Sequence, residues 1–80
     1  MTITVLLFAS YADAFGRGRL SVPLSPGATV GDVVARVRAD AGGDRLPPRP
    51  LVAVNHHYAP YDRIVGEHDE VALIPPVAGG

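Results

Sequence analysis

Four short stretches of this chain carry apolar and β-branched residues in the pattern of β-strands. Side chains of a strand point alternately to the two faces of a sheet, so apolar–polar alternation or a brief apolar run predicts a strand. The predicted strands are residues 2–9, 19–24, 51–54 and 70–74. Pro23 is expected to place the second strand at a sheet edge or to end it, because proline has no N–H to donate to a neighbouring strand.

One stretch has the spacing of an α-helix instead. Thr29 and Asp32 stand three residues apart, as in a capping box, and predict where the helix begins. Gly42 and Gly43 predict where it ends. Between them, apolar residues recur every three or four positions, as they do on the buried stripe of a helix. These residues are Val30, Val33, Val34, Val37 and Ala41.

The remaining segments lack such regular spacing. Ser10 is a candidate N-cap for a short helical turn over residues 11–15. Residues 44–50 contain three prolines and are predicted to form a surface loop. Residues 58–65 show no decisive periodicity, so they are left as coil.

The order strand, strand, helix, strand, strand predicts an α+β protein with a β-grasp (ubiquitin-like) fold. In this fold a mixed sheet carries one main helix packed on one face. Residues 1–75 are expected to form the single β-grasp domain. Residues 76–80 are expected to form a flexible C-terminal tail that ends in Gly79-Gly80.

Composition narrows the classes of function. The chain has 80 residues, of which 48% are hydrophobic, and its net charge is −1. It is therefore too apolar for a disordered chain and lacks the positive charge that attracts nucleic acids. No apolar run approaches the ~20 residues that a membrane span needs, and the chain does not open with a secretory signal pattern. We expect a cytoplasmic protein with neither nucleic-acid nor membrane partners.

The residue types also limit the chemistry. The chain has no cysteine, which excludes disulfides, thiolate-bound iron–sulfur clusters and a thiol nucleophile. A metal site could be suspected from the three histidines, which are His56, His57 and His68. Adjacent histidines in a turn, however, seldom bind the same ion. No cysteine or closely spaced acid pair completes a ligand shell. We expect these histidines to be surface turn residues and no metal to be bound.

The C-terminal residues are the strongest candidates for chemistry. Pro75-Pro76 fixes an extended exit from the last strand, and Gly79-Gly80, without Cβ atoms, fits a channel too narrow for other residues. Residues 76–80 can span at most ~16–18 Å, enough to enter a partner's active site. The reactive group at the tip is the α-carboxylate, which needs activation by adenylation. Because the chain has no phosphate-binding loop, a separate ATP-using enzyme is expected to activate it.

Three segments carry a resemblance to a known family. Residues 69–80 (DEVALIPPVAGG), 53–55 (AVN) and 5–9 (VLLFA) resemble the small subunits of molybdopterin synthase, which are ubiquitin-like sulfur carriers. The resemblance covers essentially the whole chain, and its most specific part is the PPVAGG ending. It implies a non-catalytic sulfur-donor subunit that binds no permanent cofactor and joins the large synthase subunit in a heterotetramer.

The resemblance also implies a reaction sequence. An adenylyltransferase of the ubiquitin-activating type would use ATP to form an acyl-adenylate at the C-terminus, and a persulfide sulfur donor would convert it to a thiocarboxylate. The tail would then enter the large subunit and give its sulfur to cyclic pyranopterin monophosphate, two carriers being consumed for each molybdopterin dithiolene. The predicted site comprises the sulfur-bearing Gly80, the insertion-permitting Gly79, the tail-directing Pro75, Pro76 and Val77, and the docking residues Phe8 and Ile74.

Two places depart from the family pattern. His68 stands where relatives usually have glycine, so it must adopt a positive φ if the turn before the last strand requires one. His56 and His57 stand where relatives tend to have an acidic residue. These departures concern the turn geometry and the local charge rather than the tail.

The sheet face away from the main helix is expected to carry apolar side chains, namely those of Leu6, Phe8, Ala72 and Ile74. One alternative is that the short helical turn at residues 11–15 and the long loop cover them. The other is that they form a surface shared in turn by the activating enzyme and the large subunit. The sequence leaves both alternatives open.

Three other functions fit parts of the pattern. A thiamine-thiazole sulfur carrier shares the fold, the Gly-Gly end and the activation, but such carriers tend to be shorter and to lack the Pro-Pro pair. A ubiquitin-like protein modifier would join Gly80 to lysines of other proteins, although the absence of lysine from this chain prevents chains built on itself. An inert β-grasp binding module would be unaffected by the loss of Gly79 and Gly80.

Overall fold

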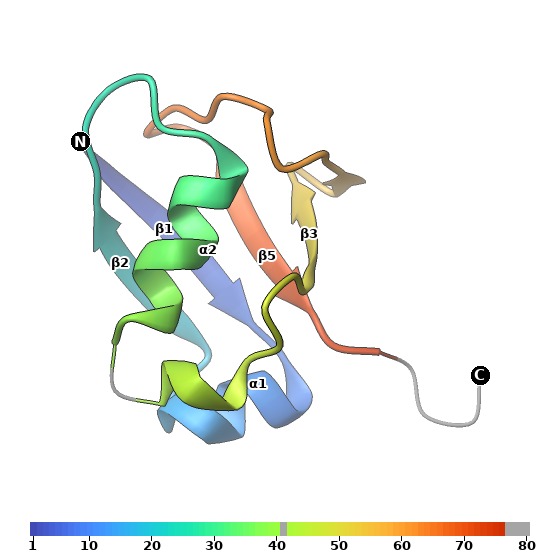
Figure 1. The fold of residues 1–80 in the computed structure, drawn as a ribbon. Helices are drawn as coiled ribbons and strands as arrows, with labels where there is room; N and C mark the ends of the chain where they lie inside the picture. Colours follow the sequence, from blue (N-terminus) through green and yellow to red (C-terminus); the bar gives the residue numbers. More distant parts are fainter. Residues whose placement is uncertain (41, 77–80) are drawn as a thin grey trace.

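The computed structural model describes residues 1–40 and 42–76 (Figure 1). Residue 41 and residues 77–80 lie outside the described part, and with them the predicted site residues Val77, Gly79 and Gly80. The helices are α1 (Ala9–Phe15), α2 (Val30–Arg38) and the 3₁₀ helix η1 (Gly43–Arg45). The strands are β1 (Thr2–Leu7), β2 (Arg19–Pro23), β3 (Leu51–Val54), β4 (His57–Tyr58) and β5 (Glu70–Ile74).

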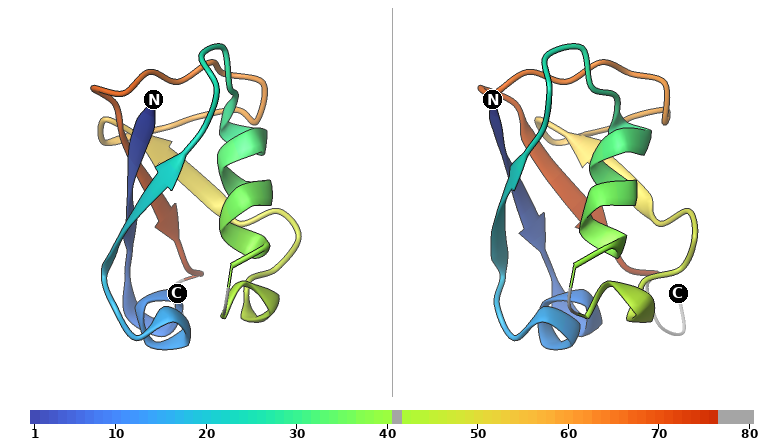
Figure 2. Two further views of the ribbon diagram at one scale, coloured as in Figure 1. Left: turned by 90° about the vertical axis from the view of Figure 1, so that its left-hand side faces the viewer. Right: turned by 60° about the vertical axis from the view of Figure 1, so that its left-hand side comes forward.

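The strands form one mixed sheet in the order β2-β1-β5-β3-β4. β1 and β5 pair in parallel, and the other neighbouring strands pair antiparallel. α2 lies across one face of this sheet, and α1 lies where β1 ends (Figure 1 and Figure 2). The predicted α+β class and β-grasp fold are therefore confirmed. β2 is an edge strand, as Pro23 predicted, and it ends at Pro23, one residue before the end of the predicted range.

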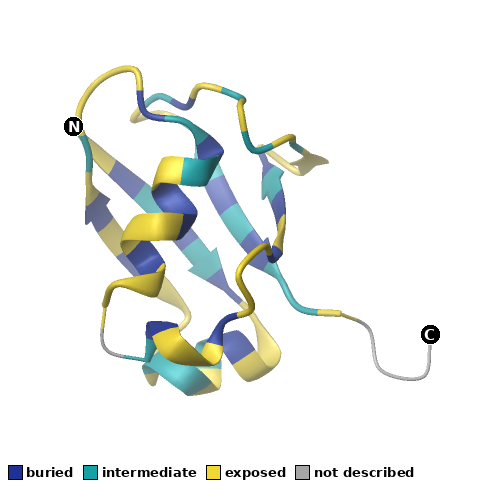
Figure 3. Ribbon diagram, viewed as in Figure 1, coloured by how far each residue is buried: buried dark blue, intermediate teal, exposed yellow. Residues whose placement is uncertain are grey.

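The hydrophobic core lies between α2 and the sheet face that it covers (Figure 3). Along β1, β2, β3 and β5, buried residues alternate with more exposed ones, which is the period of two expected for strands. Removing one such aliphatic side chain from water contributes about 1.5–3 kcal/mol. The buried residues of these elements are Ile3, Val5, Leu7, Leu20, Val22, Val30, Val33, Val34, Val37, Val52, Val54, Val71 and Leu73.

The predicted capping box holds the start of α2. Asp32 N donates to Thr29 Oγ1 at 3.2 Å, and Thr29 N donates to Asp32 Oδ2 at 2.9 Å. Val30 N donates to the carbonyl oxygen of Arg63 at 2.9 Å, so the loop before β5 also closes this helix end. These three amides therefore have partners within the chain, as helix N-termini require.

The end of α2 comes earlier than predicted, at Arg38. Gly42 and Gly43 therefore do not stop the helix, and they are needed for a different reason. A Cβ on Gly42 would lie 2.4 Å from the carbonyl oxygen of Ala14, and a Cβ on Gly43 would lie 2.3 Å from that of Arg38. Gly42 therefore allows the backbone before η1 to approach α1, and Gly43 allows η1 to approach the end of α2. η1 overlaps the start of the segment predicted as a loop.

The junction of β1 and α1 corrects two predictions. β1 ends at Leu7 rather than at Ala9, and the N-cap of α1 is Phe8 rather than Ser10. Phe8 is extended, and its carbonyl oxygen accepts a hydrogen bond from Tyr11 N at 3.0 Å. Ala9 follows with a φ of +47°, which turns the chain sharply. Phe8 consequently remains outside the helix, with 47% of its surface exposed.

The two-residue strand β4 was not predicted. Asn55 and His56 have φ values of +52° and +72° and form the two-residue turn of a hairpin between β3 and β4. In the described part of the chain, the third non-glycine residue with a positive φ is Ala9. His68 therefore does not have a positive φ, although it stands where relatives usually have glycine.

Candidate functional site

The sheet face opposite α2 carries an open groove. Its floor is a row of side chains in strand register, because Leu6 pairs with Ala72, Ala72 with Ala53 and Ala53 with Tyr58. The row crosses β1, β5, β3 and β4. The groove is lined by Leu6, Phe8, Ala53, His56, Tyr58, Glu70, Ala72 and Ile74. It thus contains all four apolar residues that were predicted for this face.

α1 does not cover this groove. Its Tyr11 is only 5% exposed and belongs to the hydrophobic core. α1 packs instead beside η1, at one end of the sheet (Figure 2). The groove lining also contains no residue of the loop at 44–50, all of which the structure describes. Of the two alternatives that the sequence left open, coverage by the short helix and the long loop is therefore wrong.

The groove is apolar at the end where the chain leaves the sheet. Ile74 is the last residue of β5 and pairs with Leu51 of β3, which is 57% exposed. Phe8 lies in the same lining. Pro75 and Pro76 follow Ile74 directly. The structure therefore brings Phe8 and Ile74, the two predicted docking residues, to one place beside the start of the predicted tail.

The other end of the groove is polar. Glu70, the first residue of β5, pairs in register with Thr4 of β1. Its Oε1 atom lies 3.6 Å from Nε2 of His56, and the two side chains are 44% and 86% exposed respectively. The groove therefore changes from apolar to polar along β5, from its last residue to its first.

A hydrogen-bonded network fixes the turn before β5. Asp69 accepts hydrogen bonds from Gly66 N and from Asn55 Nδ2, both at 2.8 Å, and its Oδ2 lies 3.6 Å from Nη1 of Arg63. The Gly66 amide first, then the Asn55 amide and the Arg63 charge, lower the pKa of Asp69. The Asp69 carboxylate therefore has its hydrogen-bond partners within the fold. Its bond with Asn55 joins segments 53–55 and 69–80, on which the family resemblance rests.

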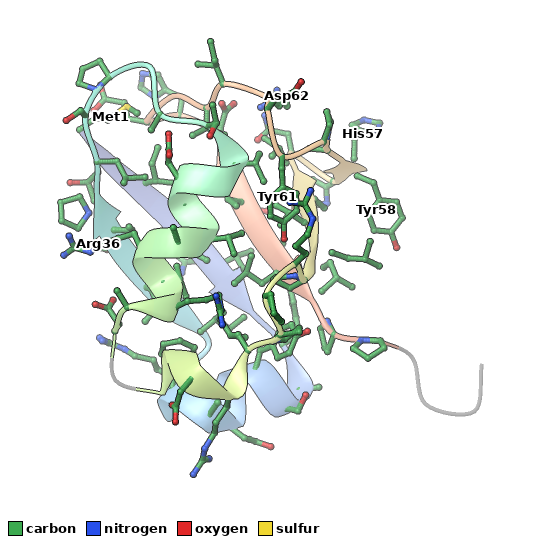
Figure 4. All side chains as sticks on the ribbon, viewed as in Figure 1. Met1, Arg36, His57, Tyr58, Tyr61 and Asp62 are labelled. Carbon is green, nitrogen blue, oxygen red and sulfur yellow. The ribbon has the colours of Figure 1, made fainter. Side chains whose placement is uncertain are left out.

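Tyr61 and Tyr58 have different roles. The Tyr61 hydroxyl donates to the carbonyl oxygen of Pro50, and the guanidinium carbon of Arg49 lies 4.2 Å from the centre of the Tyr61 ring. Burial raises the pKa of Tyr61. Tyr58 projects outward from the edge of the sheet and is 74% exposed (Figure 4). Tyr61 therefore fastens the long loop, whereas Tyr58 is available to a partner.

Sequence reasoning missed Tyr58 and Ala53 as groove residues. The short apolar run 51–54 predicts a strand but does not say which sheet face carries Ala53, and Tyr58 begins the segment 58–65, which has no decisive periodicity. The signal available was the alternation of Leu51 and Ala53 against the buried valines of the same strand. Val77, Gly79 and Gly80 lie outside the described residues, so their predicted roles stay predictions.

The described part of the chain carries neither a cluster of metal-ligand side chains nor a helix that could span a membrane. Within residues 1–40 and 42–76, no three His, Cys, Asp or Glu side chains are grouped so that they could hold a metal ion. None of the helices described is both long enough and apolar enough to cross a bilayer.

Comparison with known proteins relates almost the whole chain to one family. Residues 5–80 match the ThiS family. Two curated relatives are both named molybdopterin synthase sulfur carrier subunit. The relative from Chlamydomonas reinhardtii is 34% identical over 83 aligned residues, which cover 100% of each chain. The relative from Mycobacterium tuberculosis is 35% identical over 82 residues, which cover 98% of this chain and 96% of the relative.

Solved structures share the fold. SAMP1 from Haloferax volcanii is 28% identical and has a TM-score of 0.85 over 100% of both chains. A second crystal structure, titled H. volcanii small archaeal modifier protein 1, is 27% identical, with a TM-score of 0.82 over 95% of this chain and 98% of that one. A protein–protein complex of subunits 1 and 2 of the molybdopterin-converting factor from Helicobacter pylori contains a chain that is 18% identical. That chain has a TM-score of 0.73 over 100% of both chains, and at this identity it shows the fold alone.

Proposed function

This chain belongs to the ThiS family, and on that premise we propose that it carries sulfur on Gly80 as a subunit of a molybdopterin synthase. The observation that carries the proposal is the similarity to a molybdopterin synthase sulfur carrier subunit over 100% of both chains. The family match extends through residue 80 and so includes the PPVAGG ending. The open groove beside Ile74 supports the proposal, because a carrier needs a surface that docks while its terminus reacts elsewhere.

The chemistry is proposed to take place at the carboxylate of Gly80. A carboxylate oxygen attacks the α-phosphorus of ATP on a separate adenylyltransferase, and pyrophosphate leaves. The terminal sulfur of a persulfide then attacks the acyl carbon, and AMP leaves. This gives an acyl disulfide, in which one sulfur is bound to the acyl carbon and the other to the donor. A thiol attacks the donor's sulfur and forms a disulfide with it, so that the S–S bond breaks and a thiocarboxylate remains on Gly80. Because the chain has no cysteine, it holds no thiol that would compete for this sulfur.

The thiocarboxylate is proposed to donate its sulfur within the large synthase subunit. Gly79 and Gly80 lack side chains and fit a narrow channel, while Pro75 and Pro76 stiffen the exit from β5. The acceptor is cyclic pyranopterin monophosphate, and two carriers supply the two sulfurs of the molybdopterin dithiolene. In this scheme the chain is a non-catalytic subunit of a heterotetramer. ATP and reduced thiols, which the scheme consumes, are supplied in the cytoplasm.

The docking surface is proposed to be the groove on the open sheet face. Phe8 and Ile74 form its apolar end, and Tyr58 offers a large aromatic side chain with a hydroxyl at the sheet edge. Apolar and aromatic side chains that become desolvated at the centre of an interface carry most of its binding energy. The activating enzyme and the large subunit would use this surface in turn.

Intact mass spectrometry tests the proposal. The full chain is incubated with a ubiquitin-type activating enzyme, ATP and a persulfide donor, beside a variant that lacks Gly79 and Gly80. The proposal predicts that the full chain gains the mass difference between one sulfur and one oxygen, and that the shortened chain gains nothing. No gain by the full chain with several competent activating enzymes would contradict it.

A second candidate function is protein modification. The similarity to a protein titled small archaeal modifier protein favours it, because the same adenylated terminus can react with a lysine amine instead of sulfur. This chain has no lysine and so cannot form lysine-linked chains of itself. Covalent shifts of other cellular proteins by the mass of one carrier, lost with Gly80, would show this activity.

A further inference from the structure

His56 occupies a backbone position that favours glycine. Its φ is +72° in the two-residue turn between β3 and β4, where glycine is preferred because a Cβ is unfavourable there. Asn55, the other turn residue, is anchored by its side chain, which donates to Asp69 and accepts from Glu70 N at 2.9 Å. The side chain of His56 is 86% exposed, and the contact recorded for it in the described part of the chain is with Glu70. An unfavourable backbone position with an exposed side chain points to a role outside folding.

Glu70 differs from its neighbour Asp69 in a way that matters for docking. The Asp69 carboxylate accepts two hydrogen bonds and lies beside the positively charged Arg63. Glu70 lines the groove, and its carboxylate contacts His56 at 3.6 Å. A partner that covers the groove would remove water from the Glu70 carboxylate. A desolvated carboxylate is unfavourable unless a cation or a hydrogen-bond donor pairs with it.

We propose, on the basis of the docking surface argued above, that His56 takes up a proton when the large synthase subunit covers the groove. The imidazole is the side chain whose charge changes near neutral pH, and it already lies beside the carboxylate that loses water. The protonated imidazole donates to Glu70 Oε1 and neutralises it beneath the partner. His56 is thus a specificity residue that makes docking stronger as the pH falls toward 6.

The other titratable and charged groups around this turn do not replace His56. On β4, His57 pairs in register with the buried Val54, whereas Tyr58 pairs with the groove residue Ala53. His57 and Tyr58 accordingly project in different directions (Figure 4). Asp69 and Arg63 pair with each other, and on β1 the neighbour of Glu70 in register is Thr4, which does not titrate.

Binding to the large subunit measured from pH 6 to pH 8 tests the proposal. The chains compared are the wild type, His56→Gln, Glu70→Gln and, as a matched control, His57→Gln. The dissociation constant of the wild type is expected to fall about fivefold or more between pH 8 and pH 6, relative to that of His56→Gln. His57→Gln should follow the wild type, and Glu70→Gln should follow His56→Gln. Equal pH dependence in all four chains would overturn the proposal.

Two further readouts separate this inference from the proposed function. If the wild-type chain gains sulfur and binds the large subunit, but its affinity depends on pH no more than that of His56→Gln, only the inference is overturned. A wild-type chain that neither gains sulfur nor binds overturns both. His56→Gly should raise the melting temperature by about 4 °C, because it relieves the positive φ, and should still lose the pH dependence. A lower melting temperature would show that the imidazole mainly stabilises the fold, and would count against the inference.

Discussion

Asn55 Nδ2 donates a hydrogen bond to Asp69 Oδ1 at 2.8 Å, although the two residues stand 14 positions apart in the chain. The same side chain accepts a hydrogen bond from Glu70 N through its Oδ1 atom. One amide therefore ties the turn between β3 and β4 to the start of β5. His56 is the next residue in that turn, and it lines the polar end of the groove.

Asn55→Ala should lower the free energy of unfolding by about 2 kcal/mol, because Asp69 and Glu70 N both lose a hydrogen-bond partner. Asn55→Gly removes the same side chain but accepts the φ of +52° without strain. The glycine variant should therefore lose less stability than the alanine variant. Urea denaturation measures both, and a stability equal to that of the wild type in both variants would contradict the role assigned to Asn55.

The lowered pKa of Asp69 predicts how stability depends on pH. A carboxyl group whose folded pKa lies below its unfolded value stabilises the fold above the unfolded pKa, about 4 for aspartate. That contribution is lost as the pH falls through the folded pKa. Urea denaturation of the wild type and Asp69→Asn should thus differ most at neutral pH and converge in acid. A gap that stays constant down to pH 2.5 would contradict the prediction.

Gly42→Ala should be strongly destabilising, because its φ is +93° and the new Cβ would lie 2.4 Å from the carbonyl oxygen of Ala14. Gly27 is a matched control, since its φ is +90° but nothing lies within 4 Å of its Cβ position. Gly27→Ala should cost about 1 kcal/mol for the backbone alone, and Gly42→Ala at least about twice that. Thermal unfolding compares them, and similar losses would contradict the close approach of α1 and η1.

Docking through the groove predicts that Phe8→Asp and Ile74→Asp each weaken binding to the large subunit by about 30-fold or more. Ile64→Asp is the control, because Ile64 is also exposed, at 65%, but is absent from the groove lining. Calorimetric titration gives the affinities, and circular dichroism verifies the fold of each variant. Equal weakening by all three substitutions would show that the groove is not the docking surface.

The elements that depend on local pattern were predictable from the sequence. The capping box of Thr29 and Asp32 follows from residue spacing alone, and the structure has it. Residue type alone predicts Ser10 as the N-cap of α1, whereas the sharp turn at Ala9 makes Phe8 the cap. β4 was missed because two residues are too few for a periodic pattern, and its pairing depends on a turn with two unusual φ values.

The groove could not be predicted without the order in which the strands pair. The sequence placed Leu6 and Ala72 on the open face, but the parallel pairing of β1 with β5 is what sets them side by side. Tyr58 joins them only through β4, and the position of α1 settles that nothing from that helix covers them. The predicted chemistry at Gly79 and Gly80 rests on the residue pattern of the tail.

Transfer of sulfur from this chain to a pterin tests the central claim most directly. The chain bearing a thiocarboxylate on Gly80 is mixed with the large subunit and cyclic pyranopterin monophosphate, and the intact mass of the carrier is followed together with formation of the dithiolene. The proposed function predicts that the carrier returns to its carboxylate mass while molybdopterin appears, with two carriers consumed for each pterin. A carrier that keeps its sulfur in the presence of both would contradict it.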